Sequence, residues 1–148
     1  MFGRLVSYFI KCFLVEDHLA RYRQADLFLD THPYNAHTTA ADALMAGLPV
    51  ITYMGNSFPS RVAGSLLHAA GVPELATHSL QDYEALALQL AGNSDVLAKF
   101  KSKLVANRER YSLFDTKGFC FNLEASYIAM WRAQQLSDAM DEMGALLK

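Results

Sequence analysis

The sequence is poor in cysteine, and this excludes two classes of small protein. Its 148 residues contain two cysteines, Cys12 and Cys120, which are too few for a disulfide framework and lack the spacing of a metal site. Such sparse cysteines fit a reducing compartment, so we expect a cytoplasmic protein. The hydrophobic content of 52% and charged content of 19% are those of a globular protein rather than a disordered or fibrous one, and the length fits one domain.

The sequence also lacks an excess of charge of either sign. Its formal net charge of -2 gives no electrostatic basis for binding nucleic acid or an anionic membrane. A modest basic cluster alternates with apolar residues at helical spacing, as a solvated helix face does; its members are Lys99, Lys101, Lys103, Arg108 and Arg110. We therefore expect no nucleic-acid partner and no membrane partner.

A hydrophobic run long enough to span a membrane is missing as well. The apolar stretch at residues 5–15 is well short of the roughly 20 residues that a bilayer requires, and no signal-peptide cleavage site follows it. Its composition differs from that of the sequence downstream. Residues 1–14 are therefore an uncertain segment, which we expect to be a buried first strand or the start of a chain truncated from a longer gene.

From Val15 onward, short apolar runs alternate with helical patterns, which is typical of an α/β fold with a parallel sheet. The apolar residues of 26–30 predict a strand buried on both faces, and the β-branched residues of 49–53 predict a second strand. A helix over 38–46, ended by a glycine and then a proline, would connect the two, so we expect parallel neighbours. Further helices are predicted over 16–23 and 60–70, from Ser79, from Asp95, and from about Lys117 to beyond Met140.

The last of these helices carries a stripe of large apolar side chains. Phe119, Leu123, Tyr127 and Trp131 recur at four-residue steps, which places them on one helix face. Large aromatic side chains on such a face usually lie in the core. Trp131 and the other aromatics of this helix are therefore expected in the core by default. If the chain is only part of a larger domain, we expect this helix and the run at residues 5–15 to leave apolar surface exposed.

The stretch from Ala25 to Met54 holds the residues best suited to chemistry. Its predicted strand leads into a loop that ends in His37-Thr38-Thr39 at the start of a helix. Ligands of open parallel sheets bind beyond the carboxyl ends of the strands, and a helix N-terminus offers free N–H groups and a partial positive charge to a phosphate. The two threonines add hydroxyl donors, so the arrangement suits a diphosphate.

Asp42 extends this pattern. It follows Thr38 by four residues and Thr39 by three, so the three side chains share a helix face. A carboxylate one turn behind a phosphate site can accept hydrogen bonds from ribose hydroxyls, and the set then suits a nucleoside diphosphate. Less specific interpretations stay open: a threonine could simply cap the helix, Asp42 could be an exposed helix residue, and His37 could be a loop histidine with a backbone partner.

The motifs of one enzyme family occur here in order and spacing: ADLFLDTHPYNAHTTAADALMAGLPVITYMGNSFPSRVAGSLL, then NRERYSLFDTKGF and LEASYIAMW. From about Val15 to Trp131 the sequence resembles the C-terminal catalytic region of the O-GlcNAc transferase family, including its bacterial relatives and the plant SPINDLY-type enzymes. The resemblance implies a GT-B glycosyltransferase, in which two Rossmann-like domains face each other. Residues 15–148 are then expected to be part of the second, donor-binding domain, with a Rossmann-like parallel sheet, flanking helices and a long C-terminal helix.

The resemblance also assigns roles to residues of this sequence. The family's triplet for the donor diphosphate falls on His37, Thr38 and Thr39, and its aspartate for the ribose falls on Asp42. Its histidine near the uridine base falls on His18, in the stretch Glu16-Asp17-His18. Some members carry a base-contacting lysine three residues before that histidine; Val15 stands there in this chain, so that contact is absent or made by the backbone.

Tyr34 and Asn35, which precede the triplet, are candidates for shaping the donor loop. The reaction implied by the resemblance is transfer of N-acetylglucosamine, or a related sugar, from a UDP donor to Ser or Thr of a protein acceptor, with no metal or other cofactor. The family's first catalytic domain and its superhelical repeat region have no counterpart in these residues. No catalytic residue is assigned here, and we expect the isolated chain to be inactive.

Two other interpretations remain open. The chain could be a truncated, non-catalytic remnant that binds a nucleotide or is only structural. It could also be an unrelated small domain of flavodoxin type. The latter would need a complete five-stranded sheet, and the sequence shows only two or three convincing strands.

Overall fold

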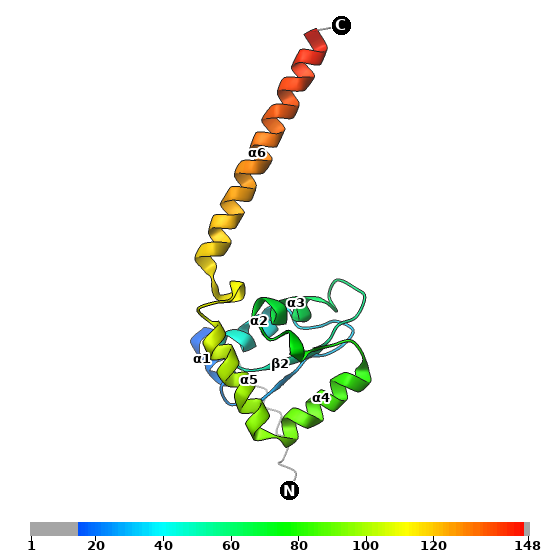
Figure 1. Ribbon diagram of the computed structural model, residues 1–148, viewed down its shortest axis with the longest axis vertical. Helices are drawn as coiled ribbons and strands as arrows, with labels where there is room; N and C mark the ends of the chain where they lie inside the picture. Colours follow the sequence, from blue (N-terminus) through cyan, green and yellow to red (C-terminus); the bar gives the residue numbers. More distant parts are fainter. Residues whose placement is uncertain (1–14, 147–148) are drawn as a thin grey trace.

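The structure, a computed structural model, describes residues 15–146 and the side chains of residues 16–137. The expectations for residues 1–14 lie outside the described residues. A small α/β body is followed by one long helix that projects from it (Figure 1). In chain order the elements are α1 (Val15–Tyr22), β1 (Phe28–Leu29), α2 (Thr38–Met45), β2 (Val50–Tyr53), α3 (Val62–Ala69), the 3-10 turn η1 (Pro73–Leu75), β3 (Ala76–Thr77), α4 (Leu80–Gly92), α5 (Ser94–Asn107), the 3-10 turn η2 (Ser112–Phe114) and α6 (Thr116–Leu146).

The described strands form a parallel sheet in the order β1-β2-β3. Phe28 pairs with Val50 across β1 and β2, and Thr52 pairs with Ala76 across β2 and β3. Helix α2 connects the first two strands, as predicted. The expected parallel sheet with flanking helices is therefore confirmed, while β3 was not predicted.

The core lies around β2, whose residues Val50, Ile51 and Thr52 are fully buried. Helices α2, α3 and α4 all contact this strand. Burial of a leucine side chain stabilises the folded state by about 1.5–3 kcal/mol, and five leucines are almost wholly removed from solvent: Leu44, Leu67, Leu75, Leu90 and Leu104. Because β2 is the central strand, β1 lies at one edge of the described sheet.

Turn and cap residues set the ends of the helices. Gly47 and Gly71, each of which follows the C-cap residue of a helix (α2 and α3), have φ +83 and φ +73, a region that favours glycine at helix C-termini. The side chain of Ser79 accepts a hydrogen bond from the amide of Asp82 and so caps α4, the helix that was predicted to begin at Ser79. None of the helices in the described part of the chain is long and apolar enough to cross a membrane.

Two predictions about burial are wrong. The first strand is shorter than expected and is not buried on both faces: Leu29 is 55% exposed, because β1 lies at the edge of the described sheet and Leu29 lines an open pocket.

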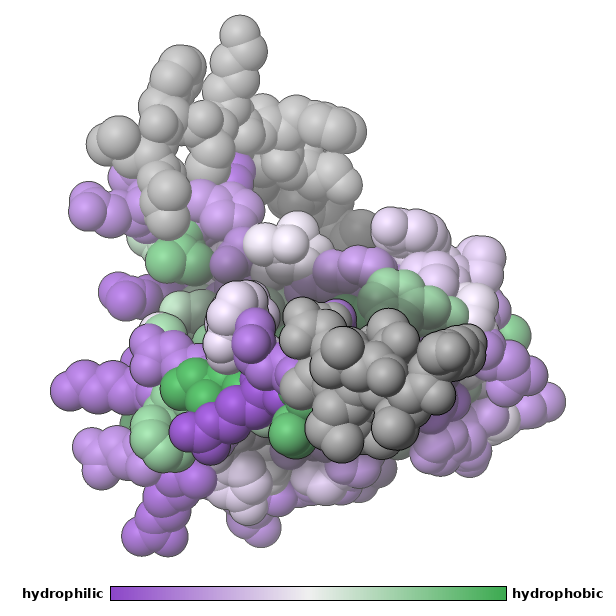
Figure 2. Space-filling model, turned by 90° about the horizontal axis from the view of Figure 1, so that it is seen from above, coloured by the Kyte–Doolittle hydropathy of each residue, from purple (hydrophilic) through white to green (hydrophobic). Residues whose placement is uncertain are grey.

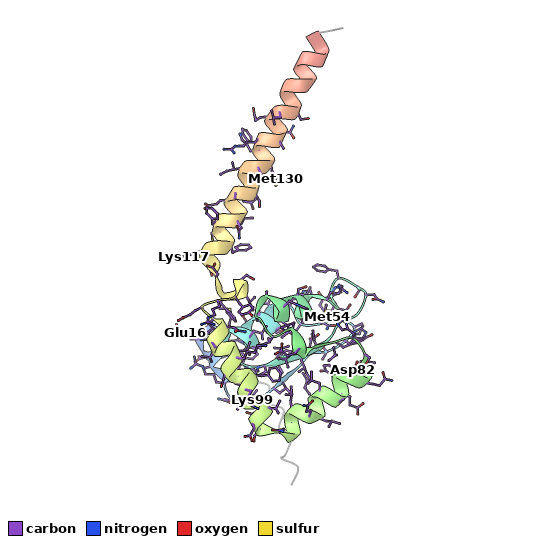
Figure 3. The ribbon with its side chains drawn as sticks, viewed as in Figure 1. Glu16, Met54, Asp82, Lys99, Lys117 and Met130 are labelled. Carbon is purple, nitrogen blue, oxygen red and sulfur yellow. The ribbon has the colours of Figure 1, made fainter. Side chains whose placement is uncertain are left out.

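The aromatics of α6 are not core residues either, and the alternative expectation, that this helix exposes apolar surface, is confirmed. Trp131 is 66% exposed, and Phe119 and Tyr127 are exposed to a similar extent. The helix leaves the α/β body after η2, so its apolar stripe meets no described surface, and Figure 3 shows its side chains, Met130 among them, standing clear of the body.

Seen from above, the body presents separate hydrophobic patches among hydrophilic residues (Figure 2).

Candidate functional site

A pocket of about 440 Å³ opens where β1 ends and α2 begins. Its lining comes from residues 28–31 and 34–39, and includes His37, Thr38 and Thr39. This is the carboxyl end of a parallel strand, where open α/β sheets bind their ligands. The structure therefore brings the three residues of the triplet together in one pocket.

The N-terminus of α2 is open toward this pocket. His37 is the N-cap residue, and no side chain of the described residues caps the helix. Thr38 and Thr39 are exposed, and the first turn has no acidic residue. The interpretation of a threonine as a simple cap is therefore wrong, and the first-turn N–H groups and the helix dipole remain available to an anion.

Asp42 lies behind the pocket and pairs with His18. The Oδ2 atom of Asp42 is 3.3 Å from Nε2 of His18, and both side chains are partly buried. Nη2 of Arg21 lies 2.9 Å from Nδ1 of His18. Because a guanidinium can only donate, Nδ1 is the acceptor and the imidazole proton sits on Nε2, facing Asp42. The two remaining predicted site residues thus form one pair that links α1 to α2, outside the lining of the pocket.

The side chain of His37 packs against aromatic rings rather than forming a hydrogen bond with the backbone. Its ring stacks on that of Tyr34, with centroids 5.4 Å apart, and meets the edge of Phe58 at 6.1 Å. Its Nε2 atom is buried and has no hydrogen-bond partner among the described residues. Tyr34 and Phe58 are themselves largely exposed. The pocket therefore combines the aromatic side chains of Tyr34 and His37 with the hydroxyls of Thr38 and Thr39.

A buried carboxylate forms the floor of the loop before α2, and it was not predicted. Asp30 is 5% exposed. Its Oδ1 accepts hydrogen bonds from the amides of Thr31 (2.9 Å) and Ala36 (2.7 Å), and its Oδ2 accepts one from Oγ1 of Thr52 (2.6 Å). The signal in the sequence was an acidic residue placed directly after an apolar strand.

Asn35 anchors the same loop to β2. Its side chain, 1% exposed, donates from Nδ2 to Oγ1 of Thr52 (2.7 Å) and to the carbonyl of Tyr53 (3.0 Å). Tyr83 of α4 donates its hydroxyl proton to the carbonyl oxygen of Asp30, at 2.7 Å. Burial, and secondarily the negative charge of Asp30, raise the pKa of Tyr83, so its hydroxyl stays a donor at neutral pH.

No group of three side chains suited to a metal ion gathers within the described residues. What the pocket offers is a set of hydrogen-bond donors and a helix N-terminus, which match an anionic oxygen ligand. The pocket is therefore suited to an anionic ligand next to aromatic side chains.

Known proteins of one family are similar to most of this sequence. Residues 6–123 match the family described as Glycosyl transferase family 41. The sequence is 38% identical over 128 residues to a UDP-N-acetylglucosamine–peptide N-acetylglucosaminyltransferase of Caenorhabditis elegans, covering 86% of this chain and 11% of the relative. It is 42% identical over 116 residues to the probable UDP-N-acetylglucosamine–peptide N-acetylglucosaminyltransferase SEC of Arabidopsis thaliana, covering 78% of this chain and 12% of the relative.

The fold is similar to that of a solved mutant of the Thermobaculum terrenum O-GlcNAc transferase. The TM-score is 0.73 at 34% identity, over 82% of this chain and 23% of that chain. The expected correspondence to part of a GT-B glycosyltransferase is thereby confirmed. The chain spans only about a tenth of the length of the two relatives, and it belongs to glycosyl transferase family 41.

Proposed function

We propose that this chain supplies the part of a protein O-GlcNAc-transferase-like enzyme that binds the UDP moiety of a sugar donor. The observation that carries the proposal is the uncapped N-terminus of α2, which opens with Thr38 and Thr39 onto the pocket at the end of β1. The names of the relatives give the donor class, UDP-N-acetylglucosamine, and a peptide acceptor. The complete enzyme would transfer N-acetylglucosamine, or a related sugar, to Ser or Thr of a protein.

In this proposal each predicted residue has one task. The amides and hydroxyls of Thr38 and Thr39 bind the diphosphate beside His37, Asp42 accepts hydrogen bonds from the ribose, and His18 lies near the uracil base. As the bond to the sugar breaks, negative charge grows on the departing diphosphate. Donors already aimed at that position stabilise the charge without reorganising. The partial positive charge at the helix N-terminus also stabilises it.

This proposal assigns no residue of the chain to binding the protein acceptor. A first catalytic domain and a repeat region would provide it, and we predict that the chain alone binds UDP without transferring sugar. The non-catalytic alternative predicts the same binding but no transfer when the missing domain is supplied. A cytoplasmic location stays a prediction from the cysteine content.

The test is a comparison of UDP, UMP and uridine by ligand-observed NMR, with the chain as it is. We expect UDP to bind most tightly and uridine most weakly, because the phosphates meet the helix N-terminus. In the double variant Thr38→Ala, Thr39→Ala, two donors to a charged partner are lost, each worth about 1.5–3 kcal/mol. At about 1.4 kcal/mol for a tenfold change, UDP should bind at least about a hundredfold more weakly, while uridine binds as before.

The matched control is Thr116→Ala, a threonine that also opens a helix, α6, but lies away from the pocket. It should leave UDP binding unchanged. Unaltered UDP binding by the double variant would show that the triplet does not contact the phosphates.

A further inference from the structure

Asp30 is a buried carboxylate with no cationic partner within 4.0 Å among the described residues. Burying a charge without a partner is costly, so such a group persists only where several hydrogen bonds compensate. Here three donors do so: the amides of Thr31 and Ala36 and the hydroxyl of Thr52. A buried carboxylate with these hydrogen bonds holds in place the segments of the chain that carry the donors.

The two amide donors stand at the two ends of one loop. Thr31 directly follows Asp30, and Ala36 directly precedes His37, the N-cap residue of α2. A single carboxylate oxygen, Oδ1, accepts from both. The loop is therefore closed on itself at the point where it enters the helix, and the start of α2 is fixed relative to the end of β1.

Thr52 connects this closure to the sheet. Its hydroxyl donates to Oδ2 of Asp30 and accepts from Nδ2 of Asn35, while Asn35 also donates to the carbonyl of Tyr53. The carbonyl oxygen of Tyr53 can only accept, so Asn35 must donate to it from Nδ2. The directions of the other hydrogen bonds in this network follow from that. A hydroxyl is required at Thr52, because it must donate and accept at once.

We infer that Asp30, Asn35 and Thr52 are positioning residues for the phosphate end of the site. They hold the loop so that the N–H groups and hydroxyls of Thr38 and Thr39 converge on the pocket. The inference rests on the proposed function, since it assigns these residues to the same diphosphate. It separates the two ends of the ligand, because the His18–Asp42 pair that would hold the nucleoside does not contact this network.

The experiment measures UDP and uridine binding by NMR for three variants of the full chain. Thr52→Val keeps the shape and removes the hydroxyl, and Thr52→Ser keeps the hydroxyl. Tyr83→Phe is the matched control, because it removes one hydrogen bond to the same Asp30 but on the α4 side, away from the loop. Urea denaturation of each variant records the loss of stability separately.

We expect Thr52→Val to weaken UDP binding about tenfold, the lower end of the loss in affinity that removal of an orienting partner causes at metal sites, and to leave uridine binding unchanged. Thr52→Ser should restore UDP binding, and Tyr83→Phe should lower stability without changing UDP affinity. If Thr52→Val does not fold, Asn35→Ala takes its place under the same criteria.

Three results would overturn the inference: UDP binding unchanged in the folded variant, an equal loss for UDP and uridine, or an equal effect of Tyr83→Phe. Unfolding of both Thr52→Val and Asn35→Ala would also reject it, since the network would then serve the fold alone. If the unaltered chain does not bind UDP, the proposed function fails and the inference with it. If UDP binding depends on Thr38 and Thr39 but not on Thr52, only the inference fails.

Discussion

His18 and Asp42, which are separated by 24 positions in the sequence, meet at 3.3 Å between Nε2 and Oδ2. The contact joins the first helix to the helix that begins at the pocket. Arg21 donates a hydrogen bond to the other ring nitrogen of His18, and this holds the imidazole in the orientation in which Nε2 faces Asp42. The carboxylate that we assign to the ribose is therefore held in place before a ligand arrives.

This pair yields the first prediction. Asp42→Ala should weaken UDP and uridine by the same factor, at least about tenfold, because both ligands carry the ribose and a hydrogen bond to a charged group is worth about 1.5–3 kcal/mol. His18→Ala should weaken both ligands as well, and the double variant should lose less than the sum of the single losses. NMR titrations of the four proteins measure this coupling. A loss confined to UDP in Asp42→Ala would contradict the ribose assignment.

The second prediction concerns alkaline pH. The pKa of Tyr83 is raised above its usual value of 10.0, so the folded state holds this proton more tightly than the unfolded state does. The resulting stability is fully present below pH 10 and is lost as the pH rises through the folded-state pKa. The free energy of unfolding should therefore fall more steeply above pH 10 in the unaltered chain than in Tyr83→Phe. Parallel curves for the two proteins would show that Tyr83 ionises normally.

The third prediction concerns the turn after α3. Gly71 has φ +73, and a Cβ atom there would lie 2.4 Å from the ring of Tyr111 and 2.6 Å from the side chain of Asn107. Gly71→Ala should lower the free energy of unfolding by about 1–2 kcal/mol from the backbone alone, and further through the displaced ring. Gly92→Ala is the control, because its Cβ would meet nothing within 4 Å. Urea denaturation compares the two; equal stabilities would refute the steric argument.

The fourth prediction concerns the exposed stripe of α6. Exposed apolar faces of this kind promote association, so the apparent mass in sedimentation velocity should rise with protein concentration. Trp131→Glu places a charge on the stripe and should reduce this association. Asn122→Glu adds the same charge to the opposite face of the same helix, at an exposed polar position, and should change it less. A chain that stays monomeric at every concentration would show that the stripe does not drive association.

The sequence predicted the parallel pair β1 and β2 because a buried β-branched strand and a helix ended by Gly47 are local signals. It did not predict β3, since Ala76 and Thr77 form a two-residue strand with no apolar run around it. It misplaced Trp131 because periodicity defines a helix face and not what covers that face. Within the site, the triplet was predicted from its position at a helix start. The bond from Thr52 to Asp30 was not, because 22 positions separate the two residues and no local pattern joins them.

The closure of the loop by Asp30 limits its length. Surface loops usually accept insertions, because the entropy of closing a loop grows slowly with the number of residues. Here the amides at both ends of the loop, Thr31 and Ala36, reach the same oxygen. One residue more or fewer between them would carry Ala36 off the carboxylate or rotate the start of α2. Apart from Asn35, this stretch can therefore vary by substitution, but an insertion or deletion within it would move the start of α2 relative to the end of β1.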